Sequence, residues 1–254
     1  MFGRYPPHFR PAAAIRIRAH RTITDRMAPQ TPILAIETSN PAAPTPDSPP
    51  SRLTGPGVCV LGHDGTVFHA PLAPVDRHDD ALLPAIDRAC SDAGVAKSVL
   101  GRIGVSIGPG GYTSIRIAVS VAKSIGEALG IGCVGVPTAQ ALVRALSLDG
   151  PSVVALAWKR EDVWVQVFDG QAPEGEGRVV RLEELSGLAQ GRTLVAEARL
   201  REKIGYTGEH ADPFFSAAAV ALLASEGTPV DPGALLPLYP REPEAVRKWH
   251  ALKR

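Results

Sequence analysis

The segment best suited to chemistry is a glycine-rich turn at residues 108–113, which reads GPGGYT. It follows an apolar run and precedes a long helical pattern, so backbone N–H groups and the positive end of a helix would face it. Such a turn can hold a phosphate, and Gly108, Gly110, Gly111 and Thr113 are the candidate residues. The spacing fits neither G-x-x-x-x-G-K-[ST] nor G-x-G-x-x-G, so a simple tight strand-to-helix connection stays open as the alternative.

The remaining residue patterns indicate neither a metal site nor a catalytic nucleophile. Two histidines four residues apart share one helical face and can bind a metal together, but no two of the seven histidines have this spacing. No serine lies in a G-x-S-x-G context, and Cys59, Cys90 and Cys133 stand singly in apolar surroundings. The sequence therefore predicts no metal ligand and no catalytic residue.

Composition and charge limit the classes of protein to which the chain can belong. The formal net charge is +1, and six arginines with one acid lie in residues 1–26, so the remainder is mildly acidic and offers no broad basic surface. No apolar run approaches the length of a membrane span. Three widely spaced cysteines argue against a disulfide framework and favour a reducing, cytoplasmic location. Residues 1–30 are interpreted as a disordered or mis-annotated N-terminal extension.

Strands and helices are predicted to alternate around the glycine-rich turn, which indicates an α/β fold. Residues 40–57 contain six prolines and are predicted to form a projecting loop. Compact apolar runs predict strands at 33–37, 58–61, 66–69, 103–107 and 133–136. Three- and four-residue spacing predicts helices at 79–93, 114–129 and 139–146. After residue 150 the pattern weakens, with strands predicted at 153–157, 163–168 and 193–196 and a helix at 215–225.

Small and apolar side chains form stripes along two of the predicted helices. Ala118, Ala122 and Gly126 recur every four residues, so another helix could approach this face closely, and the helix at 79–93 carries a matching apolar stripe. Two readings stay open: both helices simply cover the sheet, or they also present a surface to a partner protein. The candidate interface residues are Leu82, Leu83, Ile86, Ile115, Ala118, Val119, Ala122, Ile125 and Gly126.

Four segments, in the correct order, resemble the TsaB (YeaZ) family. They are ILAIETS near the start, Arg77-His78 followed by LLP, GPGGYTSIR with the helix and GV strand after it, and LPLYPR near the end. The family has the actin-like ATPase architecture, so the resemblance implies two ribonuclease-H-like lobes, at residues 31–146 with the loop 40–57 and at 147–254, the second one shortened. Gly111 and Ser114 replace the usual serine and glycine of the turn, which weakens the case for phosphate binding more than the case for the fold.

The resemblance also implies a role in tRNA modification. The chain would be a non-catalytic scaffold subunit of the tRNA N6-threonylcarbamoyladenosine machinery, paired with a TsaD-like catalytic subunit through the two helices. A TsaE-like ATPase and tRNA would join through the complex, and ATP and metal would belong to the partners, with no cofactor of its own. The same helical face predicts a homodimer of the isolated chain. A stand-alone ATP-binding transferase or kinase of the actin-like fold and a glycoprotease-like peptidase stay open as alternatives.

Overall fold

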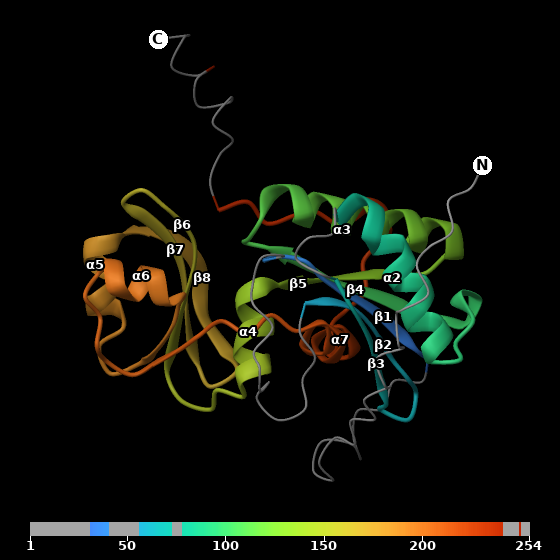
Figure 1. Ribbon diagram of the computed structural model, residues 1–254, viewed down its shortest axis with the longest axis horizontal. Coiled ribbons are helices and arrows are strands. Elements are labelled where there is room, and N and C mark those ends of the chain that lie inside the picture. The colour runs from blue at the N-terminus through green and yellow to red at the C-terminus, as the bar shows by residue number, and fades with distance from the viewer. Residues whose placement is uncertain (1–30, 41–55, 73–77, 241–248, 250–254) are drawn as a thin grey trace, which may run out of the picture.

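The computed structural model of the chain describes residues 31–40, 56–72, 78–240 and 249. The predicted N-terminal extension, most of the proline-rich loop and Arg241 of the LPLYPR segment lie outside these residues. The described part forms two lobes that lie side by side, each built on one five-stranded sheet (Figure 1).

The first lobe has strand order β3-β2-β1-β4-β5, in which β1 pairs antiparallel with β2 and parallel with β4. All five residues of β1 are buried, because helices cover both faces of the sheet at this strand. The elements are β1 (Ile33–Glu37), β2 (Gly57–Leu61), β3 (Val67–Pro71), α2 (His78–Asp92), η1 (Lys97–Val99), β4 (Arg102–Gly108), α3 (Tyr112–Leu129) and β5 (Cys133–Pro137).

The second lobe has strand order β10-β9-β6-β7-β8. Its central strand β6 pairs antiparallel with β7 and parallel with β9, as β1 does with β2 and β4. The elements are α4 (Thr138–Leu146), β6 (Ser152–Lys159), β7 (Asp162–Asp169), β8 (Ala172–Arg181), α5 (Leu182–Leu188), β9 (Thr193–Val195), α6 (Ala198–Lys203), β10 (His210–Ala211), α7 (Ala217–Glu226) and η2 (Pro232–Ala234).

The two lobes repeat one topology with elements of different length. In chain order β6 to β10 correspond to β1 to β5, and α5 and α6 take the places of α2 and α3. The helices of the second lobe have 7 and 6 residues against 15 and 18 in the first. The predicted α/β fold with two ribonuclease-H-like lobes, the second shortened, is therefore confirmed.

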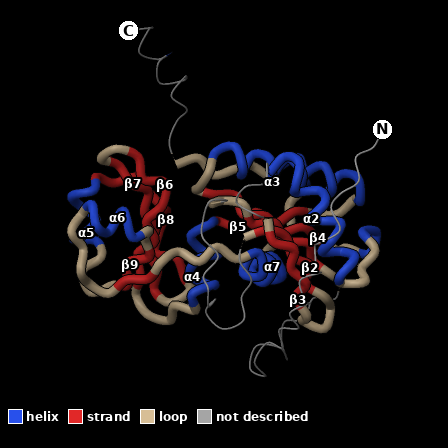
Figure 2. Tube along the Cα trace, in the orientation of Figure 1, coloured by secondary structure: helices blue, strands red, loops and turns tan. Residues whose placement is uncertain are grey.

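The last helix of each repeat packs against the sheet of the other lobe. Helix α4 follows β5 but also packs against β6, and α7 follows β10 but packs against β1, β2 and β4 (Figure 2). The sequence assigned residues 147–254 to the second lobe, and this boundary needs correction for α7. The physical reason is that its sequence, AAAVALLASE, is apolar on every side, and such a helix is stable only where it is enclosed.

Among the strands and α-helices, four were not predicted, namely β8, α5, α6 and β10. Strand β8 is an edge strand that is exposed at most positions, so its sequence shows no alternation of apolar and polar residues. The other three have between two and seven residues, too few to establish a period. Within the described segments, none of the helices has the length and apolar character needed to cross a lipid bilayer.

Candidate functional site

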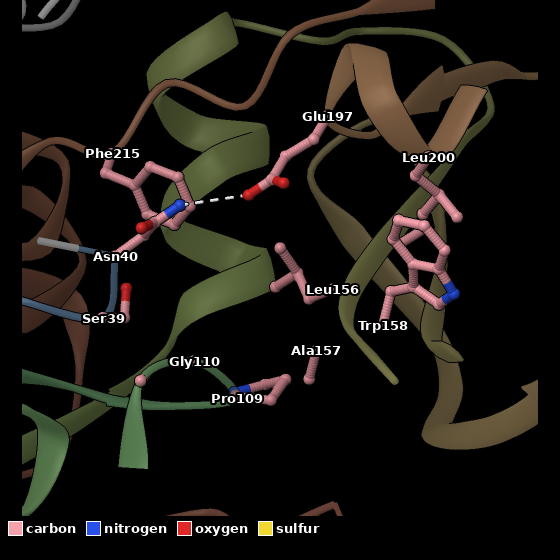
Figure 3. Close-up of a pocket in the computed structure, with 12 residues that line it drawn as sticks. Ser39, Asn40, Pro109, Gly110, Leu156, Ala157, Trp158, Glu197, Leu200 and Phe215 are labelled. Carbon is pink, nitrogen blue, oxygen red and sulfur yellow. Dashed lines mark hydrogen bonds between the residues drawn. The ribbon is translucent and has the colours of Figure 1, made fainter. Parts of the chain in front are cut away.

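A cleft of about 240 Å³ separates the two lobes at the carboxyl ends of their central strands. This is where ligands bind in many α/β proteins, because the turns that follow parallel strands converge there. Figure 3 shows side chains from both lobes pointing into it. The cleft is lined by Ser39, Asn40, Pro109, Gly110, Gly111, Ala155, Leu156, Ala157, Trp158, Glu197, Leu200 and Phe215.

Equivalent turns of the two repeats form the opposite walls. The first lobe contributes Ser39 and Asn40 after its central strand, and the second contributes Ala157 and Trp158. Between Leu156 and Lys159, strand β6 bulges away from its ladder with β7, and Ala157 adopts a left-handed φ of 52°. A non-glycine residue in this region is strained by about 1 kcal/mol or more. The bulge turns the backbone of β6 toward the cleft instead of toward β7.

The glycine-rich turn is packed against its own lobe. The N–H of Gly111 donates to the carbonyl oxygen of Ser39 at 2.7 Å. A Cβ on Gly110 would lie 2.3 Å from the same oxygen, so only glycine allows this approach, and Gly108 needs the freedom of glycine for its φ of 106°. The structure thus brings Gly110 and Gly111 to the cleft, while Thr113 is exposed on the first turn of α3. One of the donors expected for a phosphate is already used within the chain.

The charge in the cleft is negative. Glu197 stands directly before α6, at the place that Gly111 has before α3, and its Oε1 accepts a hydrogen bond from Asn40 Nδ2 at 3.2 Å across the cleft. Figure 3 shows this bridge between the lobes. None of the described residues that line the cleft is a lysine or arginine. A phosphate group in the cleft would meet the Glu197 carboxylate, and the described walls supply no side-chain cation to offset it.

A second carboxylate lies buried behind the cleft at the end of β1. Glu37 is fully buried, and its Oε1 accepts hydrogen bonds from the backbone N–H of Ser39 at 2.7 Å and from the Ser39 hydroxyl. Burial raises the pKa of Glu37, and the hydrogen bonds that Ser39 donates oppose this rise without cancelling it. Glu37 does not line the cleft, so it shapes the turn at Ser39 instead of meeting a ligand.

The described residues offer no metal centre. No group of three or more histidine, cysteine, aspartate or glutamate side chains lies close enough together there to hold an ion. Burial raises the pKa of Cys59 and raises that of Cys133 to about 11, so both thiols stay protonated and unreactive at neutral pH.

Most of the predicted interface residues face the sheet of their own lobe. The buried members pack inside the first lobe, where all of them except Gly126 are at most 3% exposed and Gly126 is also buried, so they are not available to a partner. The structure therefore favours the reading in which this stripe covers the sheet: small residues let α3 approach the sheet closely, as they would let a second helix approach. These buried members are Leu82, Ile86, Ile115, Ala118, Val119, Ala122 and Gly126.

Another face of the same two helices is exposed. Leu83 on α2 is 54% exposed, Ile125 is half-buried, and the outward positions of α3 carry small or apolar side chains. We call this surface the outer face; it consists of Leu83, Ile117, Ser120, Val121 and Ser124. Figure 1 shows α2 and α3 on the same side of the first sheet.

Sequence reasoning missed three residues that shape the site, namely Glu197, Trp158 and Phe215. Glu197 follows a predicted strand directly, so its place at a strand end was readable from the sequence. Trp158 and Phe215 reach the cleft through a bulge and through the loop before α7, and neither feature leaves a periodic signal.

The chain matches known proteins along most of its length. The family model described as "TsaD: tRNA N6-adenosine threonylcarbamoyltransferase" matches residues 70–220, which is more than half of the chain. An uncharacterised protein of Mycobacterium tuberculosis is 26% identical over 213 residues, covering 84% of this chain and 93% of that protein. The tRNA threonylcarbamoyladenosine biosynthesis protein TsaB of Bacillus subtilis is 30% identical over 99 residues, covering 39% of this chain and 38% of that protein.

Solved structures share the same fold. YeaZ from Pseudomonas aeruginosa superposes with a TM-score of 0.64 at 22% identity, covering 82% of this chain and 99% of that one. A second structure, described as similar to peptidase YEAZ from the same organism, gives the same TM-score at 20% identity and covers 83% of this chain and 100% of that one. Together with the sequence matches, this confirms the predicted resemblance to TsaB (YeaZ).

Proposed function

The chain belongs to the tRNA N6-adenosine threonylcarbamoyltransferase (TsaD) family, and on this basis we propose that it serves as a non-catalytic scaffold subunit in tRNA modification. It pairs with a TsaD-like catalytic subunit in the cytoplasm, and a TsaE-like ATPase and tRNA join through that complex. The resemblance to TsaB supports this assignment over that of a catalytic member.

The outer face is the observation that carries the proposal. A solvent-exposed side of a helix normally presents charged residues, but on this side of α3 Ser120 and Ser124 are exposed and the adjacent Ile117 and Val121 are half-buried. The neighbouring charge is directed away, since Lys123 Nζ donates to the carbonyl oxygen of Gly233 at 3.0 Å. Together with the exposed Leu83, this gives a surface that a partner helix can approach closely. The isolated chain is expected to pair with itself through the same face.

The cleft supports a role without catalysis. In a nucleotide-binding protein with two such lobes, the turns before α3 and α6 would both face phosphates. Here one turn is occupied by the Ser39 carbonyl and the other carries Glu197. ATP and metal chemistry then belong to the partner subunits, and this chain brings no cofactor of its own. The same acidic wall disfavours a stand-alone transferase or kinase, and no arrangement of described residues favours a peptidase.

The test introduces charge into the outer face without touching the core. Arginine at an exposed position leaves the chain folded, but in the complex its guanidinium is buried without a partner, at a cost on the order of 3 kcal/mol or about a hundred-fold in affinity. We expect Ser120→Arg and Ser124→Arg to lose the TsaD-like protein of the same cells in a pull-down. The matched control is Ser186→Arg, an exposed serine on α5, which should pair normally.

Two results would contradict the proposal. Normal pairing of both α3 variants would remove the outer face as the interface. Transfer of threonylcarbamoyl to tRNA by the purified chain without its partner would show that the chain is catalytic.

A further inference from the structure

A second groove, of about 320 Å³, lies on the other side of Gly110, between the end of β6 and the C-terminal segment. Three aromatic residues line it, Tyr112 from the start of α3, Trp158 from the bulge of β6 and Tyr239 from the C-terminal segment. Figure 1 shows this C-terminal segment running beside α3. The groove therefore joins residues that are more than a hundred positions apart in the sequence.

Two of the aromatic rings form an exposed stacked pair. The ring centroids of Tyr112 and Tyr239 are 5.1 Å apart with an interplanar angle of 37°, and the two residues are 52% and 38% exposed. Arg116 lies over Tyr112 at 5.2 Å from the ring centroid, and its Nη1 donates to the Tyr112 hydroxyl at 3.0 Å. Burial and the nearby Tyr112 raise the pKa of Tyr239, so its phenol stays neutral at physiological pH. The contacts with Arg116 and the stacking fix the two rings in place, and both rings still face solvent.

The charge around this pair is positive, in contrast to the cleft. Lys159 lines the groove, Arg116 is exposed beside it, and none of the described lining residues is a carboxylate. The indole N–H of Trp158 donates to the carbonyl oxygen of Arg160 at 2.7 Å, which fixes the tip that carries Lys159.

We propose that this groove is an RNA contact, in which an unpaired base stacks on the Tyr112–Tyr239 pair and the adjacent phosphates meet Lys159 and Arg116. Exposed aromatic rings with neighbouring cations and no carboxylates are the features with which proteins hold single-stranded nucleic acid. The identity of the RNA as tRNA rests on the proposed function. A duplex offers no free base face, so the groove takes an unpaired loop or end.

The stacked tyrosines of the RNA contact lie apart from the serines tested on the outer face, although Arg116 is next to Ile117 of that face. Tyr112 precedes Ser120 by eight residues on α3, which corresponds to about 12 Å along the helix axis. A variant at one place can therefore leave the other intact. This separation allows failure of the RNA contact to be distinguished from failure of partner pairing.

The test measures the affinity for a fluorescent RNA hairpin with an unpaired loop, and for a fully paired RNA duplex of the same length. Both the full chain alone and its complex with the TsaD-like protein are used. We expect Tyr112→Ala and Tyr239→Ala to weaken hairpin binding at least about five-fold, while Tyr112→Phe, which keeps the ring, binds normally. Lys159→Glu should weaken binding and reduce its dependence on salt concentration. The matched control Lys203→Glu, an exposed lysine on α6, should do neither.

Each outcome decides the proposal. Loss of hairpin binding with normal partner pairing supports it, and this holds even if the outer-face variants pair normally. Loss of partner pairing with unchanged RNA affinity would make the groove a protein contact and overturn it. Equal affinity of wild type and Tyr112→Ala, equal affinity for hairpin and duplex, or no RNA binding by either preparation would also overturn it. The circular dichroism spectrum of each variant should match that of the wild type, as expected for substitutions at exposed positions.

Discussion

The two lobes place opposite chemistry at equivalent positions. In the first lobe, the turn before α3 is made of Pro109, Gly110 and Gly111 and is closed by the carbonyl of Ser39. In the second lobe, the turn before α6 carries Glu197. The two lobes therefore share one strand topology, but the equivalent turns differ in charge.

The lengths of α3 and α6 add to the difference between the two turns that precede them. The partial charge at a helix N-terminus acts together with free N–H groups of the first turn, and α3 with 18 residues is a stable source of both. Helix α6 has 6 residues, about the length of one and a half turns, and is held by tertiary packing of Leu200. The first lobe thus keeps the frame of an anion site, and the second has lost it. Substitutions in both lobes test how far stability depends on these differences.

The largest effect is expected in the turn of the first lobe. A Cβ at position 110 would lie 2.3 Å from the Ser39 oxygen and 2.9 Å from the Ser39 carbonyl carbon, both backbone atoms that cannot rotate away. We expect Gly110→Ala to lower the free energy of unfolding by about 3 kcal/mol, measured by urea denaturation.

The control for this substitution lies in the second lobe. No atom comes within 4 Å of the Cβ position at Gly187, which is inside helix α5. Gly187→Ala should therefore raise stability by about 0.5–1 kcal/mol. Similar effects of the two substitutions would show that the turn of the first lobe is not tightly packed.

The sequence predicted the first lobe well because its elements have clear periods. Apolar strands and the amphipathic helices α2 and α3 were found within a few residues of their ends. In the second lobe, the exposed strand β8 and the short helices α5 and α6 carry too little apolar pattern to be recognised. The assignment of α7 failed for a different reason, since an apolar helix shows that it is enclosed but not which lobe encloses it.

The candidate site was predictable in part. The glycines at 110 and 111 were identified from the strand–turn–helix pattern, and they do line the cleft. The sequence could not decide whether Ala118 and Ala122 cover the sheet or meet a partner, because small residues permit close packing on a sheet as well as on a helix, and in the structure both residues are buried. The stacking of Tyr112 on Tyr239 depends on the path of the C-terminal segment, which no local pattern specifies.

A smaller effect, with a pH dependence, is expected at Glu37. Strand β1 ends in this fully buried carboxylate, whereas none of the buried residues of β6 is charged, so only the first lobe buries a carboxylate in its central strand. Its pKa is raised by burial, so the folded chain holds this proton more tightly than the unfolded chain does. The free energy of unfolding is then highest below the unfolded pKa, and falls as pH rises through the folded pKa.

The substitution Glu37→Gln tests whether the free energy of unfolding falls as pH rises. Its amide oxygen can still accept from both donors of Ser39, but the side chain does not ionise. We expect the variant to lose the fall in stability and to exceed the wild type at neutral pH, measured as urea midpoints between about pH 4 and pH 8. Parallel pH profiles of the two proteins would contradict the role assigned to burial.

The smallest effect is expected where the lobes meet across the cleft. Asn40 Nδ2 donates to Glu197 Oε1 at 3.2 Å in a solvent-exposed position, so Asn40→Ala should cost about 1 kcal/mol or less. Asn40→Asp should cost more, because two carboxylates then face each other, and added salt should reduce the difference. The double variant Asn40→Asp with Glu197→Gln restores a donor opposite an acceptor and should regain the wild-type melting temperature. If the double variant is no more stable than Asn40→Asp, the two side chains do not interact and the lobes are held together by packing around α4 alone.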